Sequence, residues 1–169
     1  MRYFFEMYRK ILVVLAVMPL IGCGYYSFSG STLPHLKTVA VPIFENETAE
    51  FGIKEEITDV IIARFTDDNT LKIADTRSAD SIISGKIVQV EDRAGAYTRD
   101  ERVEEIQVYV AVQVKFEDLK KRKTVWEGTI REVGTYVPGD AEKGTREAAI
   151  SEAIGKIADE VLNRTVTGW

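Results

Sequence analysis

The stretch IQVYVAVQVKF, residues 106–116, carries an apolar side chain at every second position. One set of alternate positions holds Ile106, Val108, Val110, Val112, Val114 and Phe116, and the other holds Gln107, Gln113 and Lys115. Strict alternation over this length predicts a long β-strand with one buried face and one exposed face. The rest of the chain must therefore supply a layer that covers the buried face.

A second strand follows after a basic interruption. Lys120, Lys121, Arg122 and Lys123 separate the first strand from TVWEGTIREVGTYV, residues 124–137. The two strands and the short break between them predict a β-hairpin with a basic tip. Two interpretations of the tip remain open. The four cations could meet an anionic surface, such as lipid phosphates or an acidic loop of a partner, or they could be a solvated turn that protects the hairpin from aggregation.

Two amphipathic helices are expected to cover the sheet. Residues 51–65 place apolar side chains at helical spacing, and a longer helix should run from after Pro138-Gly139-Asp140 to about Arg164. The apolar positions are Ile53, Ile57, Val60, Ile61 and Phe65 in the first helix, and Ala149, Ile150, Ala153, Ile154, Ile157, Ala158, Val161 and Leu162 in the second.

Shorter segments complete the sheet. Residues 37–44 (KTVAVPIF) predict a first strand that Pro42 confines to an edge or ends, followed by a polar loop at 45–48. Residues 71–74 and 82–90 predict two more strands, and Gly85 inside the latter indicates a bulge or a close backbone approach. Residues 91–105 are polar, which indicates a long loop or the splayed part of a hairpin. We therefore expect an α+β two-layer sandwich, with two amphipathic helices packed on one mixed, mostly antiparallel sheet.

The N-terminus has the pattern of a bacterial lipoprotein signal. Basic residues precede an apolar run, Ile11–Ile21, whose 11 residues are fewer than the roughly 20 that a spanning helix needs. The run ends at Leu20-Ile21-Gly22-Cys23, which resembles the lipobox of lipoprotein signal peptidase. We expect residues 1–22 to be a signal peptide. The alternatives are a conventional signal peptide with an incidental Cys, or a short buried helix.

Lipidation of Cys23 would anchor the protein to a membrane. A lipobox Cys receives a diacylglycerol and an N-acyl chain such as palmitate, and several acyl chains give stable anchoring where one is marginal. Gly24, rather than Asp, after the Cys favours the outer membrane. Residues 23–36 should form an acylated tether, whose aromatic residues Tyr25, Tyr26 and Phe28 pack on the domain or lie at the membrane interface. Residues 37–169 should form a single domain.

The composition excludes several classes of function. The 169 residues have a formal net charge of −5. Without residues 1–22, which hold Arg2, Arg9, Lys10 and Glu6, the remaining 147 residues carry 19 basic and 26 acidic side chains, a charge of −7. An acidic chain argues against a nucleic-acid partner.

Catalytic chemistry has few candidates. One Cys and one His in the whole chain exclude a disulfide framework and a Cys/His metal site, so His35 is expected in an incidental surface or capping role. The carboxylate pairs are adjacent in sequence, and the chain holds no phosphate-binding glycine loop, GxSxG or HExxH. We expect a protein that is not an enzyme, with no cofactor beyond the covalent lipid on Cys23.

The ordered combination of motifs resembles the LPS-assembly lipoprotein LptE family. The resemblance rests on the residues after the lipobox, on KTVAVPIFEN (37–46), on SIISGKI (81–87) after Ala79-Asp80, on VQVKFEDL (112–119), and on Trp126. It covers essentially the whole chain.

The resemblance implies an outer-membrane lipoprotein that lies on the periplasmic side and plugs the β-barrel LptD. Such proteins assist barrel assembly and delivery of lipopolysaccharide to the cell surface, and some bind lipopolysaccharide directly. Contact of Lys120–Lys123 with lipopolysaccharide or with the barrel remains a hypothesis from charge alone. The alternative is a lipoprotein subunit of another envelope secretion or lipid-transport complex. A third possibility, an envelope hydrolase, would require a convergent pair of carboxylates in a cleft.

Overall fold

A computed structural model describes residues 33–97, 103–140 and 144–167. The expected signal peptide, Cys23 and the three tether aromatics lie outside the described residues, so the expectations for them stay predictions.

The sheet is mixed and mostly antiparallel, as the sequence predicts. Its strands are β1 (Thr38–Ala40), β2 (Glu45–Asn46), β3 (Lys72–Ile73), β4 (Ser81–Tyr97), β5 (Val103–Asp118) and β6 (Lys123–Tyr136). The order is β3-β1-β4-β5-β6, and β2 also pairs with β4. The strand β1 is parallel to both of its neighbours, β3 and β4. The three long strands β4, β5 and β6 are antiparallel and form the main surface.

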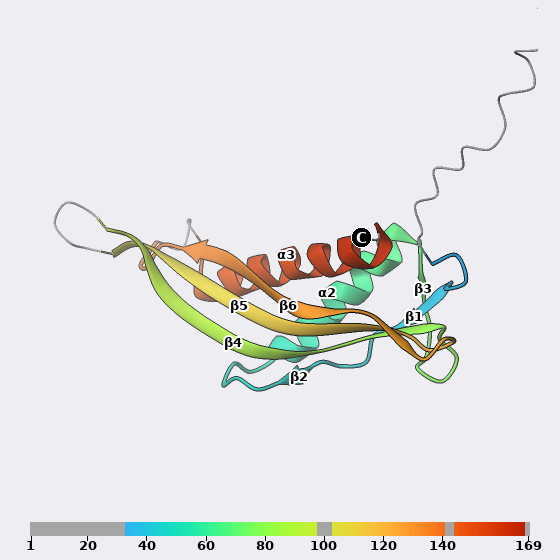
Figure 1. Cartoon of the computed structure of the whole chain (residues 1–169). Helices are drawn as coiled ribbons and strands as arrows, with labels where there is room; N and C mark the ends of the chain where they lie inside the picture. Colours follow the sequence, from blue (N-terminus) through green and yellow to red (C-terminus); the bar gives the residue numbers. More distant parts are fainter. Residues whose placement is uncertain (1–32, 98–102, 141–143, 168–169) are drawn as a thin grey trace, which may run out of the picture.

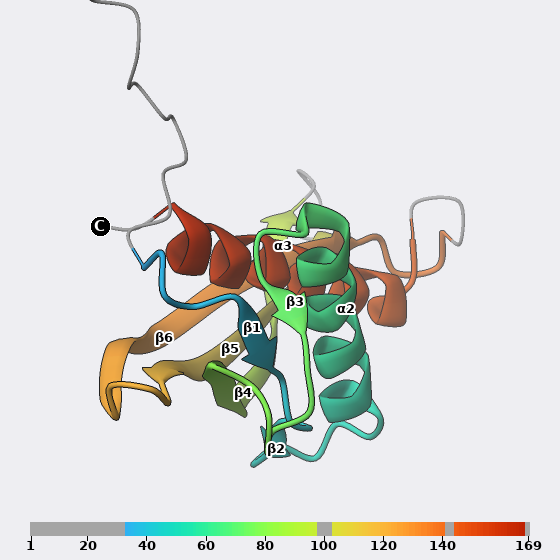
Figure 2. The same cartoon turned by 90° about the vertical axis from the view of Figure 1, so that its right-hand side faces the viewer.

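Two helices form the second layer on one face of this sheet (Figures 1 and 2). They are α2 (Ile53–Asp68) and α3 (Arg146–Val166), and they pack against each other as well as against the strands. The long helix α3 lies over β5 and β6, whereas α2 lies near β1, β2 and β3. The prediction of a two-layer α+β sandwich is therefore confirmed.

The alternation in residues 106–116 has the predicted cause. Val108, Val110, Val112, Val114 and Phe116 are each at most 1% exposed and face the helices. Side chains that alternate with them lie on the opposite, outer face of the sheet. Because one face of β5 is covered by α3 and the other face is not covered by a helix, its buried and exposed residues alternate with a period of two.

The predicted first strand is shorter than residues 37–44, but it ends before Pro42, as that residue predicts. The paired segment β1 covers only residues 38–40, because Pro42 has no backbone donor for a ladder. The segment expected as a polar loop instead contains β2, in which Glu45 and Asn46 pair in parallel with Lys86 and Ile87 of β4.

Of the two interpretations of residues 91–105, the long loop is wrong where the segment is described, and the hairpin is confirmed, with paired rather than splayed strands. The strand β4 continues to Tyr97 and β5 begins at Val103, so the two strands form one long ladder. Asp92, Arg93, Ala94 and Gly95 are all exposed, which explains the lack of a burial pattern. This part of the ladder is held by backbone pairing, which leaves no periodic signal in the sequence.

Close backbone approaches are made at two glycines. A Cβ on Gly85 would overlap the ring of Phe44 and lie 2.8 Å from the carbonyl oxygen of Gln113, so the predicted close approach at Gly85 is confirmed. A Cβ on Gly134 would overlap the backbone of Ala149 in α3. Within the described ranges, neither helix combines the length and the apolar character that a membrane crossing requires.

Candidate functional site at the tether end

Three segments that are distant in sequence meet at one end of the domain. Residues 33–36, which lead into β1, contact the turn between β5 and β6 through Lys120 and line a cavity together with the last turn of α3 (Figure 2). The basic tip therefore lies beside the point where the expected tether joins the domain. Leu36 is buried in the core, so the last residue of the expected tether already packs with the domain.

A buried carboxylate holds the tether segment to the hairpin. Asp118, at the end of β5, is 2% exposed, and its Oδ2 lies 2.5 Å from Nε2 of His35. Its other oxygen accepts a hydrogen bond from the backbone N–H of Lys121 at 2.8 Å. Burial opposes ionisation of Asp118, but the hydrogen bonds from His35 and Lys121 outweigh it and lower the pKa of the carboxyl. His35 is therefore half-buried and hydrogen-bonded to Asp118, and the expected incidental surface or capping role is wrong.

A second carboxylate fixes the tip from the other side. Asp80 accepts a hydrogen bond from the backbone N–H of Lys37 at 2.8 Å, and its Oδ1 lies 2.9 Å from Nζ of Lys120. The Lys120 ammonium also donates to the carbonyl oxygen of His35 at 2.9 Å. The hydrogen bond from Lys120 is the main reason that the pKa of Asp80 is lowered. Lys120 is thus occupied in joining the tip, the tether segment and the start of β4.

The other three cations of the tip project into solvent. Lys121, Arg122 and Lys123 are exposed, and no carboxylate in the part of the chain that the structure describes lies within ion-pair distance of them. Arg122 adopts the left-handed conformation (φ 53°), which closes the turn. The structure therefore separates one structural cation, Lys120, from three that are available to an anionic ligand.

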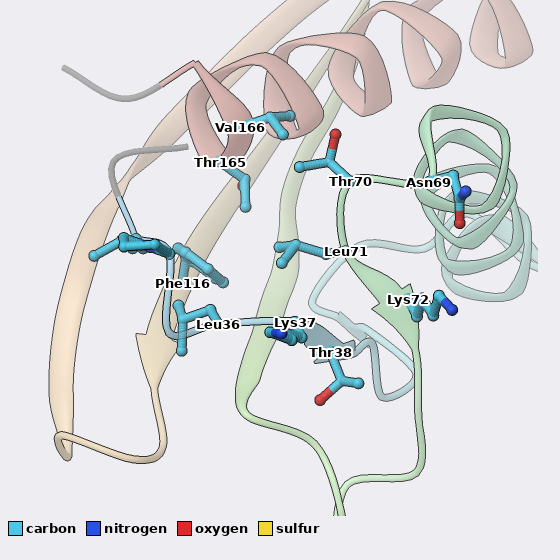
Figure 3. Close-up of a pocket in the computed structure, with 12 residues that line it drawn as sticks. Leu36, Lys37, Thr38, Asn69, Thr70, Leu71, Lys72, Phe116, Thr165 and Val166 are labelled. Atoms are coloured by element: carbon cyan, nitrogen blue, oxygen red, sulfur yellow. The ribbon is translucent and has the colours of Figure 1, made fainter. Parts of the chain in front are cut away.

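A cavity of about 410 Å³ lies beside the clasp that His35, Asp80, Asp118 and Lys120 form. Figure 3 shows side chains from the tether segment, the α2–β3 connection and α3 around it. Its apolar lining comes from Leu33, Leu36, Leu71, Phe116 and Val166, and Lys37 and Lys72 also line it. The volume is in the range of small-molecule sites. The residues that line the cavity could contact a ligand but include no pair of groups placed for catalysis.

The sequence located the tip but missed the clasp. Charge alone marked residues 120–123, whereas His35 and Asp118 are separated by 83 positions and carry no shared motif. The only signal was an acidic residue directly after an apolar strand, which is ordinary. Among the described residues, no three His, Cys, Asp or Glu side chains are placed to hold a metal ion.

Comparison with known protein families identifies the family of this chain. The LptE family, described as lipopolysaccharide-assembly, matches residues 36–165, which is most of the chain. The chain belongs to the LptE family. The match begins at Leu36 and ends in the last turn of α3, so it contains the whole sheet, both helices and the basic tip.

Solved structures share the fold of this LptE-family chain at low identity. Protein XCC0632 from Xanthomonas campestris has a TM-score of 0.59 and 12% identity, covering 77% of this chain and 84% of its own. The PelC dodecamer from Paraburkholderia phytofirmans has a TM-score of 0.56 and 16% identity, covering 83% and 95%. Rare lipoprotein B from Shewanella oneidensis has a TM-score of 0.52 and 18% identity, covering 75% and 92%. No curated protein matches the chain.

Proposed function

We propose that this LptE-family chain is a lipid-anchored outer-membrane protein that forms a complex with an LptD-type β-barrel and assists delivery of lipopolysaccharide. The family match supports the role in lipopolysaccharide assembly. The protein would act by contact and carry out no turnover.

The proposal of a barrel partner is supported by the outer face of the sheet, which is the face that the helices do not cover. On this face Arg131 donates to the Gln89 side chain at 2.7 Å, Lys115 pairs with Glu117 at 2.8 Å, and the Arg93 guanidinium lies 5.2 Å from the centre of the Tyr109 ring. The face is large, fixed by long strands and polar. The interior of an outer-membrane barrel is polar as well, so a polar sheet is suited to fill it.

The position of the tip supports a contact with lipopolysaccharide. If Cys23 is acylated, the ten residue steps from Cys23 to Leu33 span at most about 35 Å when fully extended, which keeps the tether end near the membrane. Lys121, Arg122 and Lys123 are exposed at this same end. Cations near an anionic lipid surface each contribute about 1 kcal/mol. We propose that these three contact the phosphates of lipopolysaccharide, while Lys120 holds the tip in place.

The partner is tested by purifying the tagged, acylated protein from detergent-solubilised envelopes and identifying the proteins recovered with it. We expect one large outer-membrane barrel in near-equal amount. Recovery with a ring-forming secretion complex or a lipid-transport complex, and without a barrel, would favour the alternative function instead.

The tip is tested with the triple variant Lys121→Ser, Arg122→Ser, Lys123→Ser. Binding to lipopolysaccharide vesicles should weaken on the order of 100-fold at low salt, because the three cations contribute about 1 kcal/mol each. The control removes the same charge elsewhere, at Lys54, Lys86 and Arg93, and should bind nearly as the parent protein does. Equal weakening in both variants would show that net charge, rather than the tip, determines binding.

A further inference from the structure

The two most exposed large apolar side chains of the described residues lie together. Phe51 is 98% exposed and Ile43 is 57% exposed, compared with 38% for Ile73 and 39% for Leu119. Single exposed apolar residues are common and need no explanation. Phe51 and Ile43 differ because both line one shallow hollow of about 800 Å³, between the β1–β2 connection and the start of α2.

The segment that presents Phe51 is held in one conformation. The Asn46 side-chain amide donates to the carbonyl oxygen of Glu50 at 2.7 Å, and its oxygen accepts from the N–H of Thr48 at 2.9 Å. The carboxylate of Glu50 is bound by Arg146 of α3 at 3.0 Å. Gly52 follows with a φ of 77°, which begins α2 directly after Phe51. The exposed phenyl ring has no stabilising contact in the isolated domain, but the backbone that carries it is already held, so binding a partner would order only the side chain.

Carboxylates surround the apolar pair. Glu45, Glu50 and Glu55 line the hollow, whereas Lys54 is the only cation in its lining. Glu45 has no ion pair within the described ranges, and Glu55 lies 3.6 Å from Lys54 at an exposed position. An acidic rim is repelled by anionic lipid headgroups. The surface therefore favours a protein with basic side chains over a membrane.

We propose that Phe51 and Ile43 dock into an apolar socket on the barrel partner, and that lysine or arginine side chains flank that socket. This inference rests on the proposed function, since the barrel is the partner it names. The 16-residue helix α2 separates Phe51 from Asn69, beside the cavity of the tether end, by about 24 Å at 1.5 Å per residue. The barrel contact is thus distinct from the lipid-facing tip.

Substitution of Phe51 tests the contact without disturbing the fold. The variant Phe51→Ser should melt at the temperature of the parent protein, because the side chain is almost fully exposed, yet recover at least tenfold less barrel from envelopes. Aromatic anchors commonly dominate protein interfaces. The double charge reversal Glu45→Lys, Glu55→Lys should also reduce recovery. Ile73→Ser, which removes an exposed apolar side chain outside the hollow, is the matched control and should recover the barrel in full.

Site-specific crosslinking separates failure of this inference from failure of the proposed function. A photoreactive phenylalanine analogue replaces Phe51 in one variant and Thr129, on the outer face of the sheet, in another. Crosslinks from both positions to the barrel support the inference. Crosslinks from position 129 alone, with full recovery by Phe51→Ser, overturn it and leave the barrel partner standing. Absence of the barrel even with the parent protein overturns both. Crosslinks from position 51 to lipid or to a second copy also overturn the inference.

Discussion

Two glycines of β6 face the helices at different distances, and they should respond differently to the same substitution. A Cβ on Gly134 would lie 2.6 Å from the carbonyl carbon of Ala149 and 2.9 Å from its Cα, so Gly134→Ala must displace α3. Overpacking of this kind costs about 1–3 kcal/mol, and backbone contact places this site at the upper end. Chemical denaturation with urea measures the loss.

The control for Gly134 lies six residues earlier on the same strand. At Gly128 the nearest atom to an added Cβ is a guanidinium nitrogen of Arg164 at 3.6 Å, which is ordinary contact. Gly128→Ala should change the free energy of unfolding by less than about 1 kcal/mol. A large loss at Gly128, or none at Gly134, would contradict the packing described for β6 and α3.

The Asp118 carboxylate should make the free energy of unfolding of the domain vary with pH in the acid range. Its pKa in the folded protein lies below the ordinary value of 3.8, so its contribution is present above that value. The contribution is lost as the pH falls through the lowered folded pKa, because the unfolded chain then binds the proton more readily. Asp118→Asn should be less stable at neutral pH and should lose less stability on acidification. Urea unfolding of both proteins, from neutral pH to about pH 2, measures the difference.

At the scale of the element, the sequence pattern predicted helices and strands correctly where an element buries only one of its faces. The strands β5 and β6 and the helices α2 and α3 each cover or are covered on one face, so their apolar residues follow a period of two or 3.6. The end of the β4–β5 ladder near Tyr97 and Val103 and the two-residue β2 have no such face. For the former the sequence left a loop and a splayed hairpin open, and the latter was predicted as a loop. Their pairing depends on tertiary position, which a local pattern does not encode.

The candidate site was predictable only in part, for a related reason. A run of four cations is visible in the sequence, so the tip could be proposed from charge. The assignment of Lys120 to the clasp required its partners, Asp80 and the carbonyl of His35, which lie 40 and 85 positions away. Composition similarly cannot show that Phe51 is exposed while Phe44, seven residues earlier, is 1% exposed.

Arg146, at the start of α3, binds carboxylates of β4 and of the segment before α2. Its substitution should therefore lower the stability of the whole domain. Its guanidinium lies 2.8 Å from Asp92 of β4 and 3.0 Å from Glu50 before α2. These two partners raise the pKa of Arg146 and keep it charged. Arg146→Met should lower the free energy of unfolding by about 1–2 kcal/mol, discounted because the side chain is a third exposed to solvent.

The lysine variant is the informative control for Arg146. A single ammonium cannot reproduce the fork of the guanidinium, which reaches both carboxylates at once. Arg146→Lys should therefore restore only part of the stability lost in Arg146→Met, as measured by the midpoint of denaturant unfolding. Full restoration would indicate that charge alone matters at this position.

At the scale of the whole molecule, the two proposed contacts should be separable. The tip variant should weaken binding to lipopolysaccharide and leave recovery of the barrel intact, whereas Phe51→Ser should do the reverse. Because the sites are separated by about the length of α2, their effects should add in the combined variant. Vesicle binding and barrel recovery, both measured for the four proteins, check this. A loss of both activities in either single variant would show that the two contacts are coupled.

The clasp at the tether end also determines how the domain bears mechanical load. Tension from a lipid anchor would enter at Leu33 and reach the His35–Asp118 and Lys37–Asp80 contacts before it reaches β1. The strand β1 is short, but it is held by parallel neighbours on both sides. A pull along its axis strains those hydrogen bonds together instead of one after another. With a lipid anchor at Cys23, this end of the domain would therefore resist shear along β1, because its hydrogen bonds would not break one after another.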